Sequence, residues 1–123
     1  MTDPITSARR LDMCRKLIAM RRAAHQLLGE TFSPAPCLDM LADLYTAQSE
    51  GREVYIWALC MAAHTPFSTA HRKVGDLEKQ GLVVRRSGDG DRRRIGIEMT
   101  AAGNTTLDAL LDSFIVILNP RAV

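Results

Sequence analysis

The chain has 123 residues, of which 46% are hydrophobic and 24% are charged, and its formal net charge is +2. This length suits one domain and is too short for a catalytic domain joined to a separate regulatory one. The composition excludes a disordered or fibrous protein. The longest apolar run near either end, residues 114–118, is far shorter than the roughly 20 residues of a membrane span. We therefore expect a soluble cytoplasmic domain without a membrane contact.

The residue types that mark metal sites and enzymes do not form recognisable motifs. Cys14, Cys37 and Cys60 are odd in number and lie far apart, so neither a disulfide framework nor a zinc site is expected. The histidines lack the spacing of metal ligands, and no serine elbow, phosphate loop or paired-carboxylate pattern is present. We expect neither an enzyme nor a cofactor.

Two helices are predicted in the first part of the chain. Across residues 5–28, apolar side chains recur at helical spacing with basic residues largely between them, which indicates an amphipathic helix ended by Gly29. Ser33 and Pro34 offer a cap and a first-turn proline for a second helix. That second helix should stop near Gly51.

A turn-linked helix pair is predicted next. Residues 53–56 are rich in β-forming types, and residues 57–63 have the length and alanine content of a two-turn helix. Thr65 and Pro66 form a second cap-and-proline start for a longer helix. Gly81 is suited to the left-handed conformation that ends such a helix.

A hairpin and a final helix complete the chain. Residues 82–86 and 94–99 resemble strands and flank a segment rich in glycine and aspartate, which predicts a β-hairpin. Thr100 can cap a last helix, which Pro120 would stop. The last turns of that helix are apolar on every side, so we expect a partner chain to cover them.

This order of elements predicts a mainly helical α+β fold, a winged helix-turn-helix domain with terminal dimerisation helices. The single domain would span residues 1–123. Residues 33–103 would form the winged-helix lobe, and residues 5–28 and 104–118 would form the interface of a homodimer.

The distribution of charge favours double-stranded DNA as a partner. Between residues 71 and 94 there are eight lysines and arginines against four acids. In a winged helix the second helix of the pair, here about residues 65–80, enters the major groove, while the wing, about residues 82–99, reaches the minor groove or the backbone. The candidate DNA-binding residues are Ser68, Thr69, His71, Arg72 and Lys73 on the helix and Arg92, Arg93 and Arg94 in the wing.

The wing motif resembles that of the MarR family of transcription regulators. The family pattern is Asp-x-Arg, five residues, then Leu-Thr-x-x-Gly; here it reads Asp91-Arg92-Arg93, five residues, then Met99-Thr100-Ala101-Ala102-Gly103. Residues 68–72 and 77–83 also look like the family's recognition helix and first wing strand. The resemblance covers about residues 53–103. It implies that Arg93 approaches the minor groove and that Asp91 holds the wing in shape.

We therefore expect a sequence-specific transcription regulator that acts as a homodimer and as a repressor, with a small-molecule effector as a candidate further partner. Two alternatives remain: a winged-helix interaction module or antirepressor that binds protein, and a redox regulator that switches through Cys14. Tyr55 and Trp57 either line an effector pocket or pack in the core, and we favour the core. The basic residues of the first helix are interpreted as its solvent side.

Overall fold

The computed structural model describes residues 4–28, 35–86 and 94–120. Helices predominate in these parts of the chain, and two strands form a small antiparallel sheet, which confirms the predicted fold class. The elements are, in chain order, α1 (Ser7–Leu28), α2 (Pro36–Ser49), α3 (Ile56–Met61), α4 (Phe67–Lys79), β1 (Val83–Arg86), β2 (Gly96–Met99) and α5 (Ala101–Leu118).

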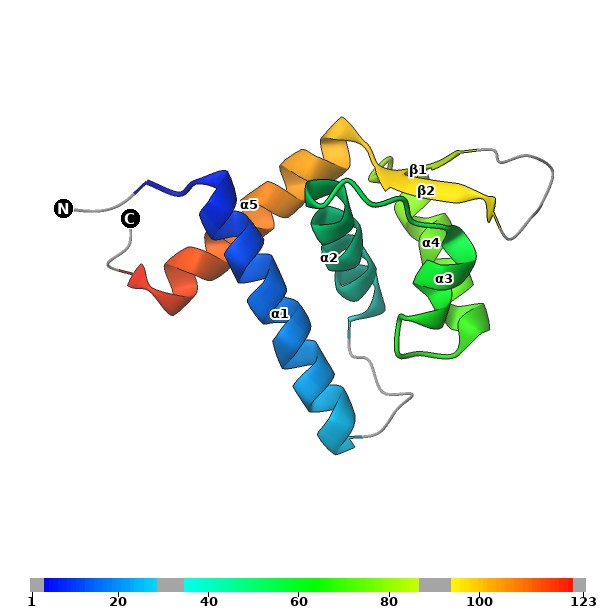
Figure 1. Ribbon diagram of the computed structural model, residues 1–123, viewed down its shortest axis with the longest axis horizontal. Coiled ribbons are helices and arrows are strands. Elements are labelled where there is room, and N and C mark those ends of the chain that lie inside the picture. Colours follow the sequence, from blue (N-terminus) through cyan, green and yellow to red (C-terminus); the bar gives the residue numbers. More distant parts are fainter. Residues whose placement is uncertain (1–3, 29–34, 87–93, 121–123) are drawn as a thin grey trace.

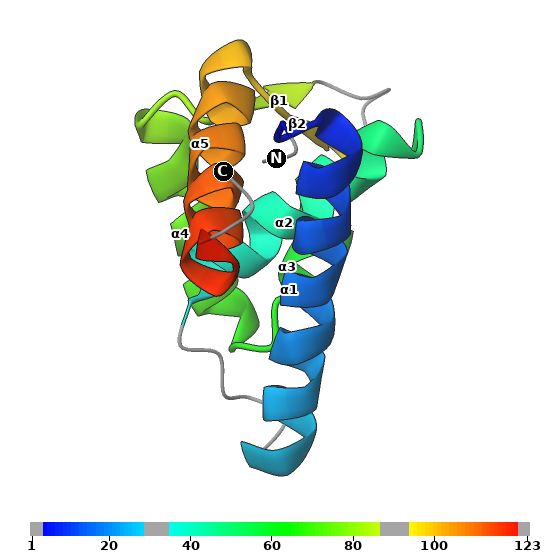
Figure 2. The ribbon, with the colours of Figure 1, turned by 90° about the vertical axis from the view of Figure 1, so that its left-hand side faces the viewer.

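Two groups of elements meet at α2. The helices α1 and α5 cross on one side of the molecule, while α3, α4 and the sheet lie on the other side (Figure 1). Helix α2 contacts α1 and α5 as well as α3, α4 and β2. A view turned by 90° looks onto the side formed by α1 and α5 (Figure 2). The long terminal helices are thus placed apart from the turn-linked helix pair.

One apolar core joins both groups. Its most deeply buried large side chains are Met40 from α2, Val74 from α4, and Leu107 and Leu111 from α5. Because these side chains pack into one cluster, a displacement of α4 would disturb the packing of the terminal helices as well.

The two strands pair in antiparallel register, with Val83 opposite Met99 and Arg86 opposite Gly96. The strand expected at residues 53–56 is only partly formed: Tyr55 makes a single bridge with Gly96, and α3 begins immediately afterwards. The backbone on either side of Tyr55 still pairs with the sheet, because the Ile97 amide donates to the Val54 carbonyl over 2.9 Å.

Three predicted helix starts need correction. Helix α2 begins at Pro36, because Ala35 before it has the non-helical φ of −145°, and Ser33 and Pro34 lie outside the described residues. Helix α3 covers Ile56–Met61 and not residues 57–63. Thr65 does not cap α4: Pro66 occupies the cap position, without a side-chain hydrogen bond.

The predicted stop of α4 and start of α5 are confirmed. Gly81 has a φ of +75°, the left-handed conformation that suits glycine after a helix. The Thr100 hydroxyl accepts a hydrogen bond from the Gly103 amide over 3.0 Å, as expected of a capping residue. Helix α5 ends at Leu118, two residues before Pro120.

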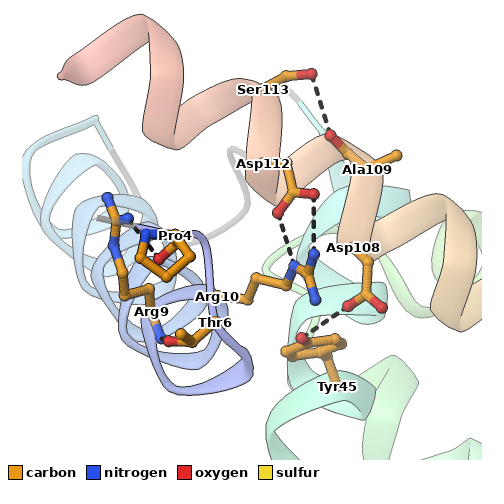
Figure 3. A network of polar contacts seen from close by, with 9 residues as sticks. All are labelled: Pro4, Thr6, Arg9, Arg10, Tyr45, Asp108, Ala109, Asp112 and Ser113. Carbon is orange, nitrogen blue, oxygen red and sulfur yellow. Dashed lines mark hydrogen bonds and ion pairs between the residues drawn. The ribbon is translucent and has the colours of Figure 1, made fainter. Parts of the chain in front are cut away.

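Two basic residues of α1 are not merely on its solvent side, which corrects the sequence interpretation. Arg10 donates to both carboxylate oxygens of Asp112, at 2.7 and 3.1 Å, and Arg21 pairs with Asp39 over 3.4 Å. The Tyr45 hydroxyl donates to Asp108 over 2.9 Å (Figure 3). The contacts of Asp112 with Arg10 and of Asp108 with Tyr45 fasten α5 to α1 and to α2, and these two aspartates lie one helical turn apart.

The middle of α1 and the C-terminal end of α5 expose apolar side chains. Met20 is 51% exposed, Ile117 70% and Leu118 64%. These three residues line a cavity of about 290 Å³ together with Met13, Leu17 and Phe114. By length and composition alone, α5 could also cross a membrane, a property that core helices of soluble proteins share.

Candidate nucleic-acid interface

Helix α4 is held by one apolar face. Ala70, Val74 and Leu77 are buried and follow the spacing of three and four residues that places them on one side of a helix. The helix packs against α3, α2 and β1. With this face fixed in the core, the opposite face of α4 is presented to solvent.

The candidate DNA-binding residues of α4 lie on that opposite face. Ser68, His71 and Arg72 are exposed, whereas Thr69 and Lys73 are partly buried along one edge. The Lys73 amine lies 3.9 Å from an Asp76 carboxylate oxygen, a long ion pair that leaves its other hydrogen-bonding positions available. The surface therefore offers hydroxyl, imidazole and guanidinium groups to a ligand.

Sequence reasoning missed Phe67 on the same face. This first residue of α4 is 40% exposed, and its ring stacks on that of His71, with the ring centroids 6.0 Å apart. The spacing of Phe67 and His71 by four residues was the available signal, because residues so spaced meet on a helix surface.

The two arginines of β1 are engaged in ion pairs, one with α4 and one with β2. Arg85 donates to Glu78 over 2.9 Å, and Arg86 donates to Glu98 over 2.6 Å. The two arginines point to opposite faces, as their neighbouring positions on one strand predict. The first pair ties β1 to α4 and the second ties β1 to β2, and both reduce the positive charge that these two residues present.

The wing candidates are only partly described. Arg94 is exposed just before β2. Asp91, Arg92 and Arg93 lie outside the described residues, so their expected roles stay predictions.

Tyr55, just before α3, and Trp57, in its first turn, lie in two different environments. Tyr55 is partly buried and lines a cavity of about 570 Å³ between the end of α2 and the sheet, and its hydroxyl donates to Glu53 over 3.0 Å. Trp57 is 49% exposed, so the preferred interpretation of Trp57 as a core residue is wrong.

The cysteines have the environment of structural thiols. Cys14 is fully buried and its thiol donates to the Ala42 carbonyl over 3.4 Å. Burial raises the pKa of Cys14, while its hydrogen bond with Thr46 lowers it. The raised pKa reduces the thiolate fraction that oxidation requires. Among the described residues, no group of three or more His, Cys, Asp and Glu side chains is arranged as a metal site.

Comparisons with known proteins identify the fold. No protein-family model and no curated protein sequence matches the chain. Among solved structures, a mutant of MepR from S. aureus is 18% identical with a TM-score of 0.61, and the alignment covers 94% of this chain and 82% of that one. A MepR–DNA complex from S. aureus is 21% identical with a TM-score of 0.56, over 95% of this chain and 82% of that one.

A MarR family transcriptional regulator from Silicibacter pomeroyi is also similar, at 25% identity and a TM-score of 0.52. The alignment covers 81% of this chain and 64% of that regulator, so part of the longer relative has no counterpart here. The predicted resemblance is confirmed: this chain has the winged-helix fold of the MarR family of transcription regulators.

Proposed function

We propose that the chain is a sequence-specific double-stranded DNA-binding regulator that acts as a homodimer and represses transcription. The observation that carries this proposal is the exposed face of α4, where Ser68, His71 and Arg72 lie together on a helix whose other face is anchored in the core. A similar solved structure is that of a MepR–DNA complex, which supports the same use of the fold.

The proposed contacts divide into two kinds. Arg72 is exposed on α4 and can donate two hydrogen bonds to one guanine edge in the major groove. Arg92, Arg93 and Arg94 in the wing would approach the minor groove or the phosphates, with Asp91 shaping the wing. Ser68, Thr69, His71 and Lys73 would fix the register of the helix on the backbone or bases.

The homodimer is proposed from the apolar side chains in the middle of α1 and at the C-terminal end of α5. Ile117 and Leu118 line the apolar cavity and are also exposed on the molecular surface. A second copy would cover this patch and place two recognition helices on the two halves of one site. Because Asp108 and Asp112 tie α5 into the fold, we assign its apolar end to a protein contact and not to a membrane.

The expected cytoplasmic location follows from this proposal, since the regulator must reach DNA. A small-molecule effector stays a prediction. The cavity beside Tyr55, about 570 Å³ in volume, is large enough for such a ligand.

The test is a fluorescence-anisotropy titration of random-sequence duplex DNA at about 50 and about 200 mM salt. Displacement of counterions from phosphates predicts a loss of affinity of at least roughly tenfold between these conditions. On an operator selected from the same pool, Arg72→Ala should reduce discrimination between operator and random DNA by about 1–3 kcal/mol. Arg93→Ala should weaken binding to both DNAs more evenly.

Arg15→Ala is the matched control, because Arg15 is an exposed arginine on α1 that does not line the apolar patch proposed as the interface, and its loss changes the net charge equally. This variant should bind like the unchanged protein. Absence of DNA binding at low salt would reject the proposal and favour a protein-interaction module. An equal effect of Arg15→Ala and Arg72→Ala would reject α4 as the reading helix.

A further inference from the structure

The exposed face of α4 carries an apolar group beside its hydrogen-bonding groups. Phe67 is 40% exposed, and its ring and that of His71 lie 6.0 Å apart with an angle of 24° between their planes. Stacking on the imidazole restricts the motion of the phenyl ring. Phe67 is therefore a positioned apolar surface at the first turn of the helix.

The aromatic pair lies beside the candidate DNA-binding residues of α4. Successive residues turn by about 100° around a helix, so Phe67 and His71 form one edge of the exposed face, and Ser68 and Arg72 lie next to them in its centre. A ligand wide enough to cover this face, as a DNA major groove is, can contact Arg72 and the edge of the Phe67 ring together.

In a DNA major groove, the apolar group that distinguishes one base from another is the 5-methyl group of thymine. We infer that Phe67 is a specificity-determining residue that packs against a thymine methyl group, with His71 as its positioning residue. This inference rests on the proposed DNA binding and adds the base that the first turn of α4 selects. Contact with one methyl group should contribute roughly a fourfold preference in each half-site.

Deoxyuridine tests the inference because it removes only the methyl group and keeps the pairing of thymine. An operator is first selected from random duplexes with the unchanged full chain, and each of its thymines is then replaced by deoxyuridine in turn. We expect one symmetry-related position at which this change weakens binding by roughly fourfold for each half-site. At that position Phe67→Ala should bind the thymine and deoxyuridine duplexes equally well.

Trp57→Ala provides the matched control, since Trp57 is another exposed aromatic residue of the helix pair but belongs to α3. It should retain the preference for thymine. The deoxyuridine scan uses the unchanged protein, so its result does not depend on whether a variant folds. If no substitution in a selected operator weakens binding, the inference is overturned while the proposed DNA binding stands. A preference that survives in Phe67→Ala also overturns it, and failure to select any operator removes both proposals.

Discussion

Asp43 is a carboxylate that the fold holds partly away from water. Burial raises its pKa to about 6; the Arg22 guanidinium opposes this shift and the Asp39 carboxylate adds to it. Both aspartates line a cavity of about 170 Å³ between α1, α2 and the turn before α4, which also contains His64. An ionised Asp43 therefore reduces stability at neutral pH.

The pH dependence follows from the higher pKa in the folded protein. The ordinary pKa of an aspartate is 3.8, so between about pH 4 and pH 6 folded Asp43 holds the proton that the unfolded chain has released. The free energy of unfolding falls as the pH rises through this window and the penalty is constant above it. We expect Asp43→Asn to raise the free energy of unfolding at pH 7.5 by about 1–2 kcal/mol, a value reduced for partial solvent exposure.

Urea denaturation at pH 7.5 and pH 4 measures this effect. The gain from Asp43→Asn should be much smaller at pH 4, where the carboxyl group is largely protonated in the folded protein. Asp12→Asn is the control, because Asp12 is exposed and pairs with Lys16 one turn away on the helix surface. Equal gains at both pH values would show that the raised pKa is not the cause.

At the scale of elements, two glycines in helices should respond oppositely to alanine. A Cβ atom on Gly103 would overlap the backbone carbonyl of Leu82, whereas one on Gly75 would meet nothing within 4 Å. We expect Gly103→Ala to destabilise the protein by about 3 kcal/mol or more, because the start of α5 must move away from Leu82, the residue before β1. Gly75→Ala should stabilise α4 by up to about 1 kcal/mol.

Thermal melting of both variants checks these signs, and Gly75→Ala serves as the control for the substitution itself. Similar melting temperatures for the two variants would contradict the close approach at Gly103. This contact also gives a physical reason for the glycine in the Thr-x-x-Gly motif: Thr100 caps α5 while Gly103 lets the helix approach the sheet.

Local signals in the sequence predicted the elements well where one residue type suits one conformation. Gly81 and Thr100 are examples, since a positive φ and a capping hydroxyl depend only on neighbouring backbone. The start of α2 was misplaced because two prolines, Pro34 and Pro36, both suit the first turn of a helix. Local propensity alone does not choose between them.

Features that depend on distant segments could not be predicted in this way. Arg10 and Asp112 are 102 positions apart, so no local pattern indicates that they meet. The exposure of Trp57 and Phe67 likewise depends on how α3 and α4 pack, not on how apolar each residue is. The order of the elements predicted the fold and the longer helix of the turn-linked pair, while the exposed aromatic edge of that helix required the structure.

At the scale of the whole molecule, DNA binding and dimerisation should be coupled. One copy has one α4, and two copies joined through α1 and α5 would offer two such helices to a site with twofold symmetry. Binding of the second helix then occurs at a high effective concentration, which raises the affinity without a new contact. Loss of the dimer should therefore weaken binding even though α4 is unchanged.

Ile117→Glu tests this coupling. It replaces a 70% exposed apolar side chain on the proposed interface by a charge, and twofold symmetry doubles its effect. Burial of one isoleucine is worth roughly 1.5–3 kcal/mol, so dimerisation should weaken by about two orders of magnitude or more. Sedimentation velocity should then detect monomers, and affinity for a complete operator should approach that for a half-site. Ala101→Glu, at the opposite end of α5, should remain dimeric; a dimeric Ile117→Glu variant would place the interface elsewhere.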